Sequence, residues 1–325
     1  MSTIEPNVRP PTPPAEPNVR LQLSNRPENV SLVRAMLVGV AEAIDLADER
    51  LDDARTAVTE ACNNVVLHAY EGDEGPLEVD VRIAEEHLTV VVRDAGIGLP
   101  RRDIALDDGG APDDDGSPRP PALEEESLEL GLPVIRALAS EVELRRPAGG
   151  GTEVRMEFAA PAGSRLDLGG GDGSAAAPLE LLSQKALFMA AEELSVQRPA
   201  PLAAVTIAIT PDRLARTVLP RLIGAMAARA NFSTDRLSDA QLVADAIAAQ
   251  AFRAIIGSHL AVGIAVEPRR VELRVGPLPV GGEREAAADS VLGELGRVVE
   301  QLIDDHSIAP VGSAAVLALQ LIDRR

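Results

Sequence analysis

Hydrophobic and polar positions follow regular patterns over two long stretches of the chain, 19–160 and 179–325. Each stretch is long enough to bury an apolar core of its own. The residues between them, 161–178, are rich in Gly, Ser and Ala, which is typical of a flexible linker. Residues 1–18 are rich in proline and hold most of two copies of the pentapeptide Glu-Pro-Asn-Val-Arg, a composition that favours a disordered or polyproline arm. We therefore predict an arm, a first domain, a linker and a second domain.

Within the first stretch, alternation of apolar and polar residues predicts strands, and apolar residues at helical spacing predict helices. The segment 101–127 holds nine acidic residues against three arginines and is rich in Pro and Gly, which predicts a long mobile loop. The expected elements are a strand at 19–24, helices at 27–45 and 51–69, strands at 77–84 and 87–94, a helix at 130–140, and strands at 142–146 and 152–159. This order indicates an α+β fold.

Four segments of the second stretch resemble segments of the first in the same order. The pairs are 237–250 with 51–64, 271–282 with 88–99, 294–304 with 129–139, and 312–319 with 151–158. The part that corresponds to the loop is shorter, because 37 residues separate Asp94 from Gly131 but only 19 separate Pro277 from Gly296. We expect a degenerate second copy of the first domain, and the alternative is an unrelated α+β domain.

The chain of 325 residues carries 31 Lys and Arg against 51 Asp and Glu, a net charge of −20. Phosphate backbones and anionic membranes require clustered cations, so this balance argues against both as the main partner. One Tyr, four Phe and no Trp argue against stacking of single-stranded nucleic acid. The single cysteine, Cys62, excludes an intrachain disulfide and a cysteine-based zinc cluster. Without a secretion signal or a long apolar segment, we expect a cytoplasmic protein.

Lysine is almost absent. Thirty of the 31 basic residues are Arg, and the only lysine, Lys185, follows no glycine-rich loop. A Walker A loop needs a lysine, and the usual eukaryotic protein-kinase fold needs one on a strand beside the phosphates. Any nucleotide must therefore be bound without lysine.

Polar residues form a stripe on the second predicted helix. Glu60, Asn64 and His68 are spaced one turn apart, while apolar residues point the other way. Asn63 and Asn64 together carry a propensity cost in mid-helix and have no capping role there. A carboxylate and an amide one turn apart can share a magnesium ion and its waters. The alternative is a solvated helix face.

Glycine-containing segments offer backbone contacts to a ligand. Residues 94–98, Asp-Ala-Gly-Ile-Gly, follow a Val-rich strand; the glycines permit a tight turn and the carboxylate can accept a hydrogen bond from an exocyclic amine. Gly131 opens the third predicted helix, where free N–H groups attract an anion. Gly151 and Thr152 place a turn and a hydroxyl before the last strand. Taken singly, each segment is equally compatible with an ordinary turn.

The order of these motifs, E-x-x-N-N-x-x-x-H, D-x-G-x-G, a lid, a glycine-led helix and G-T, resembles the ATP-binding fold shared by gyrase, Hsp90, histidine kinases and MutL (GHKL, or Bergerat-type). The run TEACNNVVLHAYEGDEGPLEVDV most resembles the anti-sigma-factor serine/threonine kinases of that superfamily. A histidine kinase would carry a dimerisation helix with a phosphoacceptor His where this chain has its Pro-rich arm. The resemblance covers 19–160 and implies a two-layer ATP-binding sandwich there.

The resemblance implies Mg-ATP as the ligand and assigns roles to single residues. Glu60 falls on the general base that takes a proton from a substrate serine, and Asn64 falls on the magnesium ligand. Asp94 falls on the acid that reads the adenine amino group, and Thr152 on the residue that supports the adenine through water. His68 is expected to be structural.

The same resemblance assigns the glycines. Gly96 and Gly98 fall on the positions that shape the adenine pocket, and Gly151 precedes the threonine of the G-T motif. Gly131 falls in the turn that binds the phosphates, where magnesium and N–H groups must stabilise the negative charge that a lysine stabilises in other folds.

One departure from the family pattern concerns phosphate. Glu129 stands where the family has the first glycine of Gly-x-Gly-Leu, and a carboxylate there repels phosphate. We therefore hold two functions open. The first is an anti-sigma regulatory factor that binds Mg-ATP, sequesters a sigma factor and phosphorylates a serine on an anti-sigma-factor antagonist of the STAS type. The second is a nucleotide-sensing module, or pseudokinase, without phosphoryl transfer.

The second copy departs from the pattern at every position that would carry chemistry. It has Ala246, Gln250 and Pro277 where the first copy has Glu60, Asn64 and Asp94. We expect it not to bind ATP. The resemblance also implies a dimer that clamps one sigma factor, so we expect either a homodimer or an intramolecular pseudo-dimer.

Overall fold

A computed structural model describes most of both halves of the chain. The described residues are 16–84, 86–98, 125–162, 203–210, 213–250, 255, 257–279, 297–311 and 314–324. The predicted arm before residue 16, most of the predicted loop 101–127 and the linker from 163 onward lie outside them.

The first half contains five strands and three α-helices among its described residues. Its elements are β1 (Val19–Ser24), the 3₁₀ turn η1 (Pro27–Asn29), α1 (Val30–Ala43), α2 (Asp48–His68), β2 (Pro76–Ile83), β3 (His87–Asp94), α4 (Glu125–Leu138), β4 (Glu141–Arg145) and β5 (Glu153–Ala159). The predicted strands and the first two predicted helices are confirmed, with bounds shifted by a few residues.

The second half repeats this order. Its described elements are β6 (Ala203–Ile209), α6 (Arg213–Arg229), α7 (Thr234–Gln250), β7 (Leu260–Glu267), β8 (Arg270–Pro279), α9 (Arg297–Leu302), β9 (Asp305–Val311) and β10 (Ala314–Ile322). The segments paired by sequence therefore fall on elements of the same type: α2 with α7, β3 with β8, α4 with α9, and β5 with β10.

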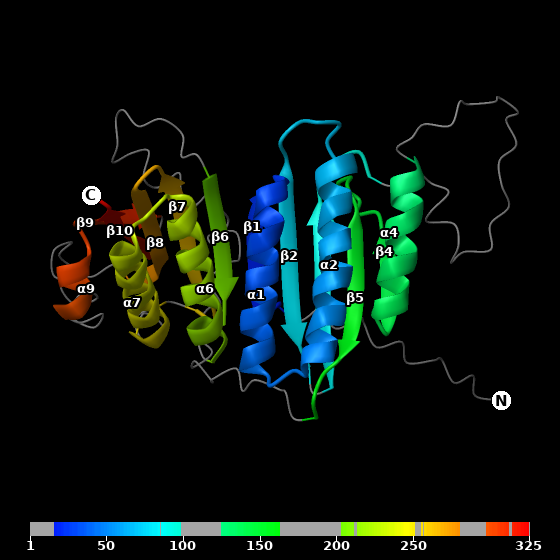
Figure 1. Ribbon diagram of the computed structural model, residues 1–325, viewed down its shortest axis with the longest axis horizontal. Helices are drawn as coiled ribbons and strands as arrows, with labels where there is room; N and C mark the ends of the chain where they lie inside the picture. The colour runs from blue at the N-terminus through cyan, green and yellow to red at the C-terminus, as the bar shows by residue number, and fades with distance from the viewer. Residues whose placement is uncertain are drawn as a thin grey trace, which may run out of the picture.

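The ten described strands form one antiparallel sheet in the order β4-β5-β3-β2-β1-β6-β7-β8-β10-β9. The described helices cover one face of this sheet (Figure 1), which gives a two-layer α+β architecture. The alternation along β1 explains the layering, because Val19, Leu21 and Leu23 are buried beneath α1 while the residues between them are less buried.

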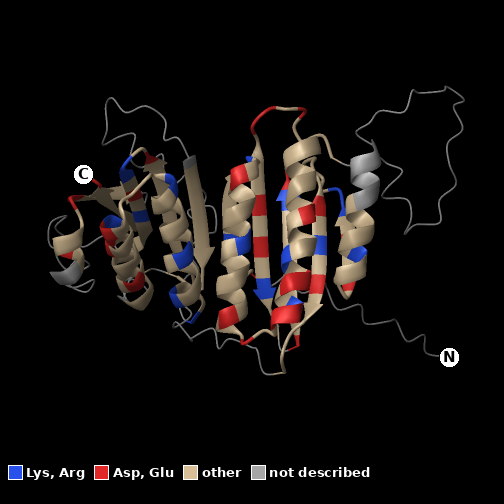
Figure 2. Cartoon of the chain, in the orientation of Figure 1, with Lys and Arg blue, Asp and Glu red and all other residues tan. Residues whose placement is uncertain are grey.

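The other face of the first half carries a network of charges. Arg20 Nε donates to Asp80 Oδ1 at 2.8 Å, and Arg93 Nε donates to Glu153 Oε2 at 2.7 Å. Burial lowers the pKa of Arg93, but its hydrogen bonds to Asp80 and Glu153 outweigh this, so the pKa is raised overall. Figure 2 shows charged positions along β2, whereas the described part of β6 has none.

The third predicted helix begins earlier than its sequence pattern suggested. We predicted a helix over 130–140, but α4 begins at Glu125. The residues 125–129, Glu-Glu-Ser-Leu-Glu, are mostly good helix formers, and acidic residues in the first turn are favoured by the helix dipole. Among the described helices, none combines the length and the apolar character needed to cross a membrane.

Candidate functional site

The polar stripe of α2 lies beside α4. Glu60, Asn64 and His68 are each partly buried, and α4 packs against this helix. A Cβ atom on Gly131 would lie 3.2 Å from Asn64 Oδ1 and 3.3 Å from its Nδ2. The Asn64 amide therefore reaches the α4 backbone at the point where α4 has no side chain.

Gly131 does not open a helix in this structure. Because α4 begins at Glu125, Gly131 lies inside the helix, and the expectation that it offers free N–H groups at an N-terminus is wrong for this conformation. Pro133, two residues further on, lacks an N–H and leaves one carbonyl of the preceding turn without its helical donor. The helix therefore continues through Gly131, with one helical hydrogen bond fewer near that residue.

Asp94, the last residue of β3, is joined by hydrogen bonds to Thr152, the residue directly before β5. The Asp94 N–H donates to the Thr152 carbonyl at 3.0 Å, and the Gly96 N–H donates to Asp94 Oδ1 at 2.8 Å. Burial raises the pKa of the Asp94 carboxyl, while hydrogen bonds from Gly96 and Thr152 act in the opposite direction. The result is a partly buried carboxylate held in a fixed orientation, able to accept a further hydrogen bond from a ligand amine.

Two glycines allow the backbones around Asp94 to approach each other. A Cβ atom on Gly96 would lie 1.9 Å from the Ala69 carbonyl oxygen, and one on Gly151 would lie 2.0 Å from the Asp94 carbonyl oxygen. Gly151 also has φ +78°, a conformation that favours glycine. The structure therefore brings together the residues after β3, the turn before β5 and the end of α2.

Gly98 lies in the same loop and has φ +77°. Its Cα is flanked by the Gly151 carbonyl oxygen and by the guanidinium of Arg146, each 2.9 Å from where a Cβ would stand. Arg146 Nη2 donates to the Ile97 carbonyl at 2.6 Å. This arginine, which the sequence analysis did not single out, ties the loop after β3 to the β4–β5 turn.

Tyr70 is a second residue that sequence reasoning missed. Its hydroxyl accepts a hydrogen bond from the Ala95 N–H at 2.8 Å and donates to the Pro76 carbonyl at 2.5 Å. Burial and the Asp94 charge raise the pKa of Tyr70, against the effect of the Ala95 hydrogen bond. Its position as the only tyrosine, directly after the polar stripe, was the available signal.

The two groups of candidate residues are connected through the end of α2. The Ile97 N–H donates to the Ala69 carbonyl at 3.0 Å, so the Asp94 loop is fastened to the chain five residues after Asn64. The His68 Nε2 atom is buried and has no hydrogen-bond partner. It lies between the two groups along the chain and is consistent with a structural position at the helix end.

The donor set suits a nucleotide with magnesium. In the part of the chain that the structure describes, no three His, Cys, Asp or Glu side chains gather to hold a metal by themselves. Magnesium retains several waters and takes many of its ligands from phosphates, so one amide oxygen such as that of Asn64 is a sufficient protein ligand. Asp94 has the acceptor chemistry that an adenine amino group requires.

Comparisons with known proteins agree with this geometry. Residues 23–158 match the family described as "Histidine kinase-like ATPase domain", which is the class of protein that the two-layer α+β fold of the first half and its antiparallel sheet indicate. The relatives include "Serine-protein kinase RsbW" of Bacillus pumilus, 30% identical over 137 residues, which are 40% of this chain and 80% of that protein. "Anti-sigma F factor" of Caldanaerobacter subterraneus subsp. tengcongensis is 29% identical over 138 residues, 42% of this chain and 90% of that protein. The chain therefore belongs to the anti-sigma-factor serine kinase family of histidine kinase-like ATPases.

Proposed function

We propose that the first half binds Mg-ATP, sequesters a sigma factor and phosphorylates a serine on an anti-sigma-factor antagonist. The observation that carries this proposal is the connection between Asp94 and Asn64. Asp94 is fixed by Gly96 and Thr152, and its loop is bonded to Ala69 at the end of the helix that bears Asn64. This connection supports the proposal, because the candidate acceptor for adenine and the candidate oxygen ligand for magnesium lie on one continuous piece of structure.

Each residue then has a defined task. Asp94 accepts a hydrogen bond from the adenine amino group, and Thr152 supports the same ring through water. Asn64 is a ligand of magnesium, which neutralises phosphate charge when bound. Glu60 takes the proton from the hydroxyl of the substrate serine while the serine oxygen bonds to the γ-phosphorus of ATP. The bond between the γ-phosphorus and the oxygen that bridges it to the β-phosphate breaks, and ADP leaves.

The partners follow from the family and from charge. Relatives are named "Anti-sigma F factor" and "Serine-protein kinase RsbW", and a sigma factor with a basic DNA-binding surface suits a chain of net charge −20. The antagonist would be a STAS-type protein that presents the serine. No direct contact with nucleic acid is part of this proposal.

We also propose that 179–325 is a degenerate copy of 19–160 without a nucleotide site, with 1–18 as an arm and 161–178 as a linker. The repeated order of strands and helices supports this. So do Ala246 and Pro277, which offer neither a carboxylate nor an amide at two of the positions that would carry chemistry.

A second function, nucleotide sensing without transfer, is favoured by one observation. Glu129 and Gly131 both lie inside α4, so this conformation presents no helix N-terminus to the phosphates at the place where the family has a glycine-rich turn. Transfer would then need α4 to unwind around Gly131, whereas adenine binding at Asp94 would not.

Binding and transfer assays separate the two functions. Asp94→Asn should lower ATP affinity by about tenfold or more, as expected for a lost hydrogen bond to a charged group. Glu60→Gln should preserve binding and reduce transfer from labelled ATP to a STAS-type antagonist by about 10² to 10⁴-fold. Glu49→Gln, an exposed substitution on the same helix, is the matched control.

The outcomes are distinct. Unchanged ATP affinity in Asp94→Asn would contradict the adenine assignment. Measurable ATP binding that Asn64→Ala abolishes, without any transfer to the antagonist by the unmodified chain, would establish the second function instead of the first.

A further inference from the structure

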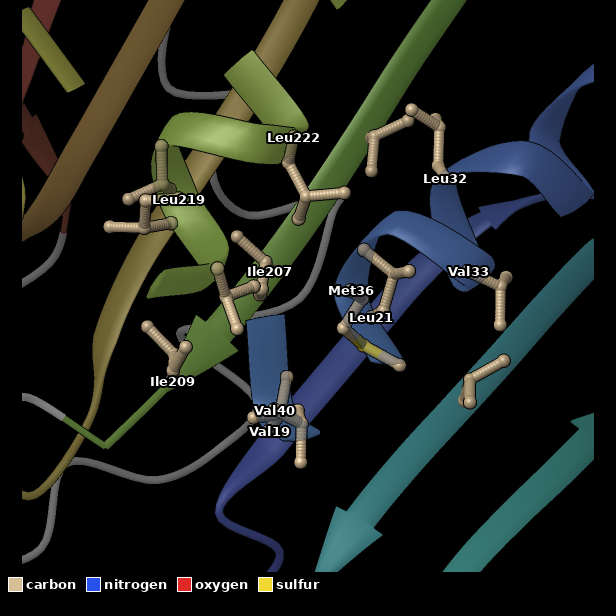
Figure 3. Packing of buried hydrophobic residues seen from close by; sticks show 14 of the residues in the cluster. Val19, Leu21, Leu32, Val33, Met36, Val40, Ile207, Ile209, Leu219 and Leu222 are labelled. Carbon is tan, nitrogen blue, oxygen red and sulfur yellow. The ribbon is translucent and has the colours of Figure 1, made fainter. Parts of the chain in front are cut away.

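In the part of the chain that the structure describes, the two halves meet at the strand pair β1–β6 and the helix pair α1–α6. β1 and β6 run antiparallel, with Val19 opposite Ile209 and Gln22 opposite Thr206. α1 and α6 lie side by side above them, and Figure 3 shows buried side chains of both halves gathered between these four elements. The surface formed by β1 and α1 is therefore covered by the same chain.

Gly39 sets the distance between the two helices. A Cβ atom at this position would lie 2.8 Å from the Thr217 carbonyl oxygen and 2.9 Å from Val218 Cα. These are backbone atoms, so they cannot move aside unless α6 moves as a whole. The α1 surface is thus shaped for a helix at this close distance.

The halves are arranged alike on either side of this junction. Outward from it, the order is β1-β2-β3-β5-β4 in the first half and β6-β7-β8-β10-β9 in the second. Asp45 and Asn231 have φ 52° and 57°, and each stands two residues after the last residue of α1 or α6. This pair of residues provides a common reference for comparing positions in the two helices.

The polar contacts across the junction are not symmetric. Arg221 pairs with Glu42, and Arg213 Nη1 lies 3.2 Å from Asp45 Oδ2. A third arginine of α6, Arg229, donates to oxygen atoms at the start of α1. In all three contacts α6 supplies the cation and the first half supplies the oxygen.

Like halves could not make these contacts. Arg221 lies ten residues before Asn231 in α6, and the residue ten before Asp45 in α1 is Ala35. Glu42 lies three residues before Asp45, and the residue three before Asn231 is Ala228. Two first halves would set Glu42 against Ala35, and two second halves would set Arg221 against Ala228. Exposed ion pairs add little strength, but they discriminate between partners.

We propose that the second half is the dedicated partner of the β1–α1 surface, so that the chain is a monomer in which this surface is closed from within. Apolar burial supplies the strength of the contact, and the arginines of α6 select the first half rather than another second half. Each molecule then carries a single copy of the binding surfaces of the first half. The proposal does not depend on nucleotide binding.

The mass of the full chain in solution is the first test. Light scattering at micromolar concentration should give the monomer mass of 34.1 kDa. A stable dimer would overturn the proposal. To learn whether the contact is made within a chain, Glu42 and Arg221 are both replaced by Cys and treated with a bismaleimide.

The crosslinked product should run as a monomer on a denaturing gel, and a covalent dimer would show that the halves pair between chains. Cys62 does not interfere, because it is fully buried and burial raises the pKa of its thiol to about 12. The unmodified chain treated with the same reagent is the control.

A charge-reversal cycle tests the selectivity of the contact. Glu42→Arg and Arg221→Glu should each lower the Tm by about 1 to 3 °C, and the double variant should regain most of the loss. Arg216→Glu, an exposed reversal on the same helix, should have little effect. A double variant that shows the sum of the two losses would refute a specific pairing.

Discussion

At the scale of single residues, Asp94 stands out because its burial and its proposed role conflict. Burial raises the pKa of its carboxyl, and only hydrogen bonds from Gly96 and Thr152 counteract this. A group whose folded pKa is raised contributes stability below its unfolded pKa of about 3.9 and loses that contribution as the pH rises through the folded pKa. The ionised carboxylate therefore lowers the stability of the fold at neutral pH. Packing alone gives no reason to keep a carboxylate at this position.

Asp94→Asn should consequently separate stability from function. The amide oxygen can keep the Gly96 hydrogen bond without the cost of a buried charge, so the free energy of unfolding at pH 7.5 should equal or exceed that of the unmodified chain. The advantage should shrink at pH 3.5, where both side chains are neutral. Urea unfolding at these two pH values, on either side of the isoelectric point of 4.6, measures the difference. A variant clearly less stable at pH 7.5 would contradict this account.

Tyr70 gives a second prediction at this scale. Tyr70→Phe removes the hydroxyl that joins Ala95 to Pro76, and should cost about 1 kcal/mol of stability and weaken nucleotide binding by loosening the Asp94 loop. Because the pKa of Tyr70 is raised, its contribution persists below the ordinary value of about 10 and is lost as the pH rises through the folded pKa. Urea unfolding at pH 8 and pH 11 should therefore show a smaller gap between the two proteins at the higher pH. An equal gap at both would show that the hydroxyl is not responsible.

At the scale of elements, the site depends on how α2 and α4 pack. Glycine within a helix costs about 0.5 to 1 kcal/mol relative to alanine, so its presence at position 131 needs a reason. The Asn64 amide supplies one, since it fills the space beside Gly131. Alanine at position 131 would stabilise the helix, whereas glycine leaves room for the amide of the proposed magnesium ligand.

Gly131→Ala tests this opposition. The added methyl would lie 3.2 Å from Asn64 Oδ1, so the amide must shift by a few tenths of an ångström. We expect α4 to gain up to about 1 kcal/mol of helix stability, while magnesium-dependent ATP affinity falls several-fold. Calorimetric titration with and without magnesium measures this, and a loss of equal size in both conditions would argue against a role for Asn64 at the metal.

The sequence predicted elements better than it predicted contacts. Alternation along β2 and β3 gave both strands and their pairing, because buried apolar residues recur at every second position, as Val79 and Val81 do in β2. The start of α4 was missed because Glu125 and Glu126 continue the acidic composition of the preceding segment. Tyr70 and Arg146 were missed as site residues because their roles come from hydrogen bonds to backbone atoms of segments distant in sequence, Ala95 and Ile97, which no periodicity reveals.

At the scale of the whole molecule, the junction between β1 and β6 joins the halves into one sheet. Its core residues, such as Leu21, Ile207 and Met36, are fully buried, and they belong to the same apolar cluster as the centres of both halves. Two units that share a continuous sheet and core should not unfold independently. The unmodified chain should therefore show a single calorimetric transition for these parts.

Gly39→Ala tests whether the junction is the source of this cooperativity. The new Cβ would meet backbone atoms of Thr217 and Val218 at 2.8 to 2.9 Å, so α1 and α6 must move apart, at a cost of about 1 to 3 kcal/mol for overpacking. Gly149→Ala is the matched control, because a Cβ there meets nothing within 4 Å. Scanning calorimetry should show a lower Tm and a broadened or divided transition for Gly39→Ala alone. If its transition stays single and sharp at the Tm of the control, the close approach of the two helices does not couple the halves, and their cooperativity must come from β1 and β6.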